Sequence, residues 1–144
     1  MSSYADTGFL VALYKEESTS VAANEAIRDA PGPVLISPLV ELEFRNAMHL
    51  AVFRNELARA EAAELLVMFI EDIRSGIYLV PAVPSAELHK KAFLLSDLYS
   101  ADLGTRSLDL MHVASAVILG AETFLSFDSR QRAAAKAEGL EASP

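Results

Sequence analysis

Three aspartates stand where an apolar segment of the chain meets a helix. Asp6 follows the apolar start of the chain, Asp109 opens an apolar helical run, and Asp128 closes the apolar run 123–127. Two carboxylates about 4 Å apart repel each other by roughly 4 kcal/mol at an effective dielectric constant near 20, so a chain that gathers them needs a cation between them. The chain has no cysteine, and oxygen ligands alone suit a hard ion such as Mg²⁺ or Mn²⁺, which supports phosphodiester hydrolysis.

Each aspartate also has a plain structural interpretation. Asp6 could cap the first helix by accepting a backbone N–H. Asp128, followed three residues later by Gln131, resembles a capping box, and Asp109 could complement the dipole of its helix. Three acids at equivalent positions between strands and helices nevertheless favour a shared site.

The elements that must position these acids alternate between short apolar strands and helices. The pattern predicts strands at 4–6, 34–36, 78–80 and 123–127, and helices at 7–15, 18–28, 37–54, 57–75, 84–99, 109–119 and 129–139. Continuous apolar strands between helices are typical of an α/β fold with a parallel sheet covered on both faces. Ligands of such sheets lie beyond the carboxyl ends of the strands, which is where the aspartates fall.

A fourth acid is expected on the helix that follows Ser37-Pro38, where Glu41 and Glu43 compete. At about 100° per residue the two side chains point roughly 200° apart, so one site cannot face both. Glu41 has Arg45 four residues on, which predicts an exposed ion pair. Glu43 shares an inward stripe with apolar residues and has no basic partner at helical spacing, so an inward carboxylate here would need a cation. We therefore select Glu43.

Four sequence elements resemble those of the PIN-domain ribonucleases, and more narrowly those of VapC-type toxins of bacterial toxin–antitoxin pairs. They are Asp6-Thr7, Glu43 followed by Asn46-Ala47, Arg106-x-x-Asp109-x-x-His112-x-Ala114, and Ser126-x-Asp128. The resemblance runs from the first strand to the last helix. The sequence departs from the family pattern at Ser126, where threonine is more usual, but both residues supply a hydroxyl.

The resemblance implies a PIN-like parallel sheet of about five strands and an acidic site. The acids of this site would be Asp6, Glu43, Asp109 and Asp128, binding Mg²⁺ or Mn²⁺ for endonucleolytic cleavage of RNA. Members of the family commonly form homodimers and are held inactive by a cognate antitoxin protein. The expected function is thus a metal-dependent endoribonuclease that acts as a toxin.

Several other residues are expected to support the acids. Thr7 and Ser126 could hydrogen-bond a water molecule at the metal or orient a carboxylate, although a helix cap and a strand-end hydroxyl explain them equally well. Arg106 could pair with a site carboxylate or contact phosphate. Asn46 could orient the glutamate one turn before it. His112 is interpreted as a packed, hydrogen-bonded histidine rather than a catalytic base.

Composition sets the remaining expectations. A chain of 144 residues predicts one domain, 1–144. Its net charge of −8 gives no overall attraction to RNA. We find no signal-peptide pattern and no apolar run long enough for a bilayer, so a cytoplasmic protein without membrane contact is expected. A mean hydropathy of +0.27 predicts a homodimer that covers part of the apolar excess. That excess includes Met48, Val52, Phe53, Met68, Phe69, Phe93 and Leu94.

Two alternatives from other classes stay open. The chain could be a phosphohydrolase or phospho-acceptor domain with Asp6 as nucleophile. However, haloacid-dehalogenase-like phosphatases need a second aspartate at the position that Gly8 occupies here, and we cannot place both the aspartate and the lysine of a receiver domain. The chain could also be a non-catalytic PIN-like module that only binds RNA or a protein, although it retains all four acids. The identity of the RNA cannot be read from one sequence.

Overall fold

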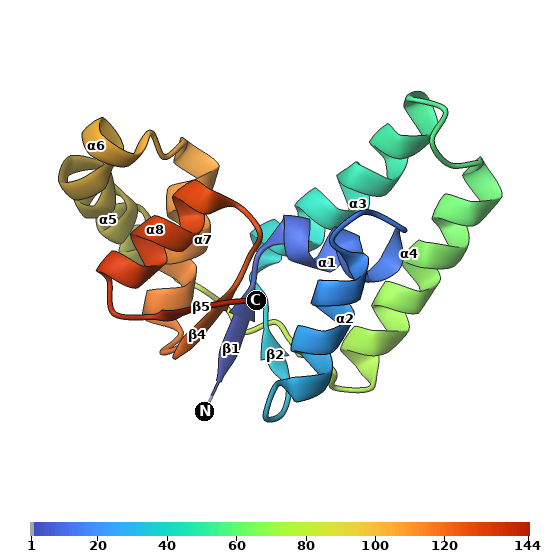
Figure 1. The fold of residues 1–144 in the computed structure, drawn as a ribbon, viewed down its shortest axis with the longest axis horizontal. Coiled ribbons are helices and arrows are strands. Elements are labelled where there is room, and N and C mark those ends of the chain that lie inside the picture. The colour runs from blue at the N-terminus through green and yellow to red at the C-terminus, as the bar shows by residue number, and fades with distance from the viewer. Residues whose placement is uncertain (1) are drawn as a thin grey trace.

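A five-stranded parallel sheet forms the centre of the protein in the computed structural model, which describes residues 2–144 (Figure 1). Its strand order is β3-β2-β1-β4-β5. The strands are β1 (Ser3–Ala5), β2 (Val34–Leu35), β3 (Tyr78–Leu79), β4 (Thr123–Leu125) and β5 (Glu141–Ser143). Tyr4 of β1 pairs with Leu35 on one side and Phe124 on the other. Because all pairs are parallel, the carboxyl ends of the strands share one edge.

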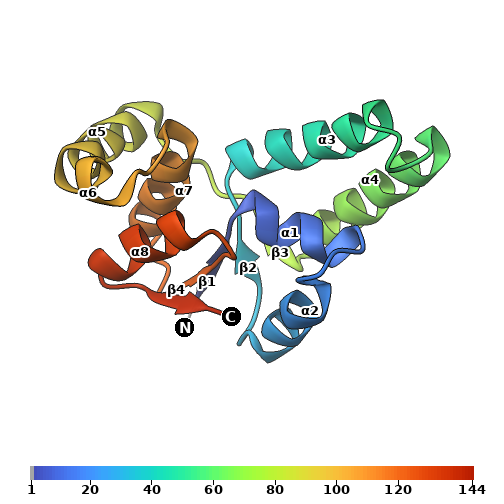
Figure 2. The same ribbon diagram turned by 45° about the horizontal axis from the view of Figure 1, so that its top comes forward.

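Helices flank this sheet in two groups. The helices are α1 (Thr7–Tyr14), α2 (Ser20–Asp29), α3 (Pro38–Phe53), α4 (Arg59–Arg74), α5 (Ser85–Leu95), α6 (Ala101–Leu103), α7 (Ser107–Ile118) and α8 (Ser129–Ala137). Figure 2 shows α1–α4 together on one side and α5–α8 on the other. Among residues 2–144, every helix is too short or too polar to traverse a lipid bilayer.

The expected fold class is confirmed, with two local differences. The α-helix expected at 84–99 ends at Leu95, and the chain continues directly as a π-helical turn, Ser96–Ser100. The edge strand β5 was not among the strands expected from the local pattern. Its sequence Glu-Ala-Ser has low strand propensity, and it forms because β4 offers a free edge beside it, for example where the Ser126 N–H donates to the Ser143 carbonyl at 3.0 Å.

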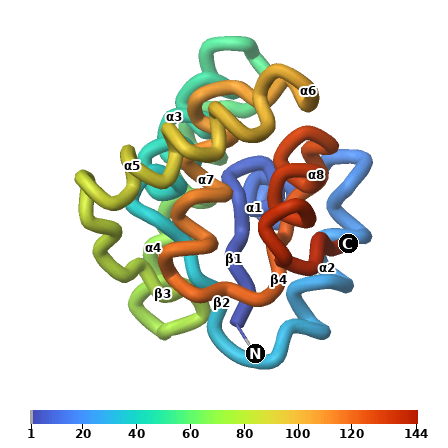
Figure 3. The backbone as a smooth tube through the Cα atoms, turned by 90° about the vertical axis from the view of Figure 1, so that its left-hand side faces the viewer, coloured from blue at the N-terminus to red at the C-terminus, as the bar shows by residue number. Residues whose placement is uncertain are grey.

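The core is built on the central strand and on the helices that cover it. Strand β1 lies between β2 and β4 (Figure 3), and its Tyr4 is fully buried and stacks on Phe124 with ring centroids 5.8 Å apart. Phe44 of α3 and Phe69 of α4 meet with centroids 4.2 Å apart. Phe69 and Met48 are fully buried, so they are core residues. The expectation that they contribute to an apolar surface excess is wrong.

Candidate active site

A cavity of about 770 Å³ opens where the carboxyl ends of β1 and β4 meet the helices, and all four predicted acids line it. Asp6 comes from the end of β1, Asp128 from the segment after β4, Asp109 from the first turn of α7 and Glu43 from α3. The remaining lining residues are Thr7, Gly8, Glu17, Ser18, Thr19, Arg106, Ser107, Leu108, His112, Phe127 and Gln131. The fold thus brings together side chains that lie more than a hundred residues apart in the sequence.

Asp6 is both a helix cap and a cavity residue. Its Oδ1 accepts the backbone N–H of Phe9 at 2.8 Å, which caps α1, and its Oδ2 accepts the Ser126 hydroxyl at 2.5 Å. The side chain is almost completely buried. Burial raises the pKa of Asp6 above its ordinary value, although the bonds from Ser126 and Phe9 act to lower it. The capping interpretation is therefore correct but does not exclude a role in the site.

Asp128 caps α8, but the capping box expected with Gln131 does not form. Asp128 Oδ1 accepts the backbone N–H groups of Arg130 and Gln131, each at 2.9 Å. Instead of returning to the backbone of Asp128, the Gln131 side-chain amide donates to Asp109 Oδ1 at 3.0 Å. Gln131 is thus a cavity residue that sequence reasoning assigned to a helix end. Its buried Oε1 has no hydrogen-bond partner among residues 2–144.

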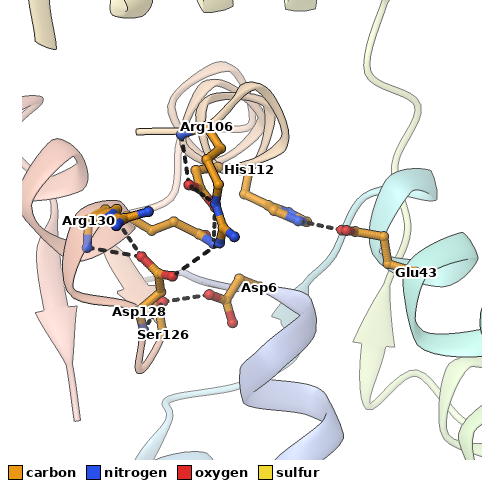
Figure 4. A network of polar contacts seen from close by, with 9 residues as sticks. Asp6, Glu43, Arg106, His112, Ser126, Asp128 and Arg130 are labelled. Atoms are coloured by element: carbon orange, nitrogen blue, oxygen red, sulfur yellow. Dashed lines mark hydrogen bonds and ion pairs between the residues drawn. The ribbon is translucent and has the colours of Figure 1, made fainter. Parts of the chain in front are cut away.

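Arg106 supplies a positive charge between two of the acids. Its Nε lies 3.2 Å from Asp109 Oδ2, and its backbone N–H donates to the same oxygen at 2.9 Å. Its Nη2 lies 3.7 Å from Asp128 Oδ2. Figure 4 shows the guanidinium reaching across to Asp128. The expected pairing of Arg106 with a site carboxylate is therefore present, and the arginine side chain itself stays largely exposed.

Glu43 has no basic partner at helical spacing, as expected, but it has one from another helix, so the conclusion that only a cation could balance this carboxylate is wrong. His112 Nε2 lies 2.6 Å from Glu43 Oε1, and the Thr7 hydroxyl donates to the same oxygen at 2.8 Å. The partner escaped helical-spacing arguments because it comes from α7, 69 residues later. Burial acts to raise the pKa of Glu43, but the bonds from His112 and Thr7 outweigh it and lower the pKa.

Two further expectations on α3 have different outcomes. Glu41 forms the predicted ion pair with Arg45 at 3.8 Å on the outside of the helix. Asn46 was expected to orient Glu43, but it is exposed and makes no hydrogen bond to Glu43 in the described chain. The contact fails because Thr7 and His112, from other elements, hold the carboxylate instead.

The donor set fits a hard divalent cation held loosely. The four acids offer only oxygen atoms, as Mg²⁺ and Mn²⁺ prefer. Within residues 2–144, no three acidic, histidine or cysteine side chains form a ready-made group of ligands. Mg²⁺ usually keeps several waters and binds through one or two carboxylates, so an open arrangement suits it. The unpaired Gln131 Oε1 leaves a further buried acceptor near Asp109.

Solved structures of similar fold include a toxin and a toxin–antitoxin complex. VapC20 of Mycobacterium tuberculosis, described as a toxin that cleaves the sarcin–ricin loop, superposes with a TM-score of 0.72 at 21% identity, covering 99% of this chain and 100% of the other. A toxin–antitoxin complex from Klebsiella pneumoniae gives 0.60 at 18%, covering 92% and 91%. FitAcB from Neisseria gonorrhoeae gives 0.59 at 15%, covering 99% and 96%. At these identities the likeness shows the fold.

The sequence itself carries the family signal. No curated protein sequence is similar enough to count as a match. The model of the PIN domain, by contrast, matches residues 3–137, which include strands β1 to β4 and all of the cavity-lining residues. The chain therefore belongs to the PIN domain family.

Proposed function

We propose that this protein is a metal-dependent endoribonuclease that uses Mg²⁺ or Mn²⁺. The observation that carries the proposal is the convergence of four carboxylates, Asp6, Glu43, Asp109 and Asp128, on one cavity at the carboxyl edge of the sheet. Such a concentration of negative charge is unfavourable without a cation. Arg106 offsets only part of it.

The four acids would hold the metal, and the bound ion would lower the pKa of water and stabilise charge on a phosphodiester. Neighbouring side chains hold these acids in place by hydrogen bonds. Ser126 anchors Asp6, Gln131 anchors Asp109, and Thr7 anchors Glu43. Arg106, exposed at the rim of the cavity, offers a guanidinium that can donate to phosphate oxygens.

We further propose that the enzyme is the toxin of a toxin–antitoxin pair, with RNA as substrate and a separate antitoxin protein as partner. The support comes from the family membership and from the fold shared with VapC20 and with the Klebsiella complex. A homodimer belongs to the same proposal. It is supported by large apolar side chains that remain exposed on α3 and α5, such as Phe53 and Phe93.

An RNA cleavage assay tests the activity. We expect the purified protein to cut a mixture of cellular RNAs internally with Mn²⁺ or Mg²⁺ and not with EDTA. Asp109→Asn should be slower by about a hundredfold or more. This variant can keep its local structure, because the unpaired Gln131 Oε1 can accept the new amide after a side-chain flip. Cleavage that survives EDTA, or that Asp109→Asn retains, would overturn the proposal.

The same samples separate the alternatives. Release of phosphate from a small phosphomonoester, lost in Asp6→Asn, would indicate a phosphohydrolase. RNA binding without cleavage under any metal would indicate a non-catalytic module.

A further inference from the structure

We propose that His112 is a positioning residue for Glu43, which it anchors through one carboxylate oxygen so that the other faces the cavity; this inference rests on the proposed metal-dependent activity. His112 is buried on α7, yet its Nε2 emerges at the cavity wall 2.6 Å from Glu43 Oε1. Figure 4 shows the ring of His112 pointing toward the carboxylate of Glu43.

The two hydrogen bonds to Glu43 converge on a single oxygen. His112 Nε2 and the Thr7 hydroxyl both reach Oε1, at 2.6 and 2.8 Å, while Oε2 has no hydrogen-bond partner among residues 2–144. A free glutamate on a helix surface samples many rotamers, because its side chain has three rotatable bonds. Two donors on one oxygen fix these rotations and leave the second oxygen available to a cation.

His112 is itself held from the centre of the sheet. Its Nδ1 lies 3.1 Å from the hydroxyl of Tyr4, a fully buried residue of β1. The Tyr4 hydroxyl also lies 2.9 Å from Ser37 Oγ. The hydrogen bonds can run in one direction, from Ser37 to Tyr4, from Tyr4 to His112 Nδ1, and from His112 Nε2 to Glu43, which fixes the ring orientation.

This chain of hydrogen bonds begins and ends on the same helix. Ser37 is the N-cap of α3, where it accepts the backbone N–H of Val40, and Glu43 lies two turns further along α3. Tyr4 in turn is fixed by stacking on Phe124. These hydrogen bonds therefore hold Glu43 in a fixed position relative to the central strands, and Asp6 follows one of those strands, β1. Partners of this kind, behind the ligands of a metal, typically change affinity or activity by about tenfold to a hundredfold when removed.

The test measures Mn²⁺ binding to the RNA-free protein by titration calorimetry, alongside RNA cleavage. His112→Leu should weaken Mn²⁺ binding by about tenfold or more. His112→Gln, whose amide can donate from near the position of Nε2, should recover most of that loss. His49→Leu, an exposed histidine on the outer face of α3, is the matched control and should bind Mn²⁺ as the wild type does.

A double-variant cycle separates positioning from packing. In a Glu43→Gln background, His112→Leu should change Mn²⁺ affinity by less than about twofold, because the group that it positions is already altered. A loss of the same size in both backgrounds, or a loss of thermal stability with unchanged Mn²⁺ affinity, would overturn the proposal. Should His112→Leu fail to fold, Thr7→Val removes the other donor and should show the same dependence on Glu43. A wild type that neither binds Mn²⁺ nor cuts RNA would instead refute the proposed function.

Discussion

Replacing Glu43 by glutamine, with Glu41→Gln as its control, tests the assignment of the fourth acid most directly. The amide oxygen of the introduced glutamine can still accept the hydrogen bonds of Thr7 and His112, so the local structure can persist while the charge is lost. Because the pKa of Glu43 is lowered, the wild-type side chain is ionised at neutral pH and the substitution removes a full charge.

The magnitude follows from that charge. A unit charge about 4 Å from another contributes roughly 4 kcal/mol at an effective dielectric constant of 20, and about 1 kcal/mol in bulk water. Glu43 is half-buried, which places its effect between these limits. We expect Glu43→Gln to slow Mn²⁺-dependent cleavage by at least about tenfold, or roughly 1.4 kcal/mol of barrier. Glu41→Gln loses only an ion pair on the outside of α3 and should stay close to the wild type.

The stability of the metal-free protein gives an independent check on the same pair. A carboxyl with a lowered folded-state pKa adds stability above its unfolded-state pKa, and that stability is lost as the pH falls through the folded-state value. Glu43→Gln should therefore unfold at a lower temperature than wild type at pH 7, and the difference should fade as the pH falls below the ordinary pKa range of glutamate. The assay compares both variants on one RNA at saturating Mn²⁺. A larger loss of activity in Glu41→Gln than in Glu43→Gln would refute the assignment.

Four shorter predictions concern the rest of the site and the assembly. Asp6→Asn should abolish cleavage yet leave the metal-free melting temperature at pH 7 equal or higher, because burial raises the pKa of Asp6 and ionising it costs stability; a clear drop in calorimetry would favour a purely capping role. Arg106→Gln should tighten Mn²⁺ binding measurably, because it removes a positive charge beside Asp109 and Asp128, and weakened binding in titration calorimetry would contradict this. Expression should slow bacterial growth and Asp109→Asn should not, so equal harm in growth curves would exclude nuclease action as the cause. Light scattering at micromolar concentration should give a dimer, reduced by Phe53→Ser or Phe93→Ser, and a mass of 15.5 kDa for the wild type would contradict it.

Local sequence signals predicted the elements that carry the acids. Ser37-Pro38 predicted the start of α3, and the structure shows Ser37 as its N-cap with proline in the first turn. Asp6 and Asp128 were readable as caps because capping involves backbone N–H groups only two or three residues away. The alternation of apolar strands with helices then predicted which edge of the sheet these residues share.

Contacts between distant elements were beyond such reasoning. His112 meets Glu43 across 69 positions, and Gln131 meets Asp109 across 22. No periodicity relates these pairs, because their approach depends on how the fold places α7 relative to α3 and packs it against α8, rather than on spacing within one helix. The strand β5 was missed for the same reason, since its pairing is supplied by β4 and not by its own residues.

The hydrogen bonds divide the four carboxylates into two kinds. Asp6 and Asp109 are bonded at both oxygens, by Phe9 and Ser126 and by Arg106 and Gln131 respectively. Glu43 and Asp128 each have two donors on one oxygen, and in the described chain their second oxygen accepts no hydrogen bond.

Asp6 and Asp109 are therefore held in place as fixed negative charges in the cavity. Glu43 and Asp128 each have one oxygen that can turn toward a cation without breaking a hydrogen bond. The free oxygen of Asp128 already faces the Arg106 guanidinium at 3.7 Å. Because the exposed guanidinium is positive, it repels a cation placed directly beside it. We infer that a cation is best held on the Glu43 side of the cavity, where His112 and Thr7 leave one carboxylate oxygen free.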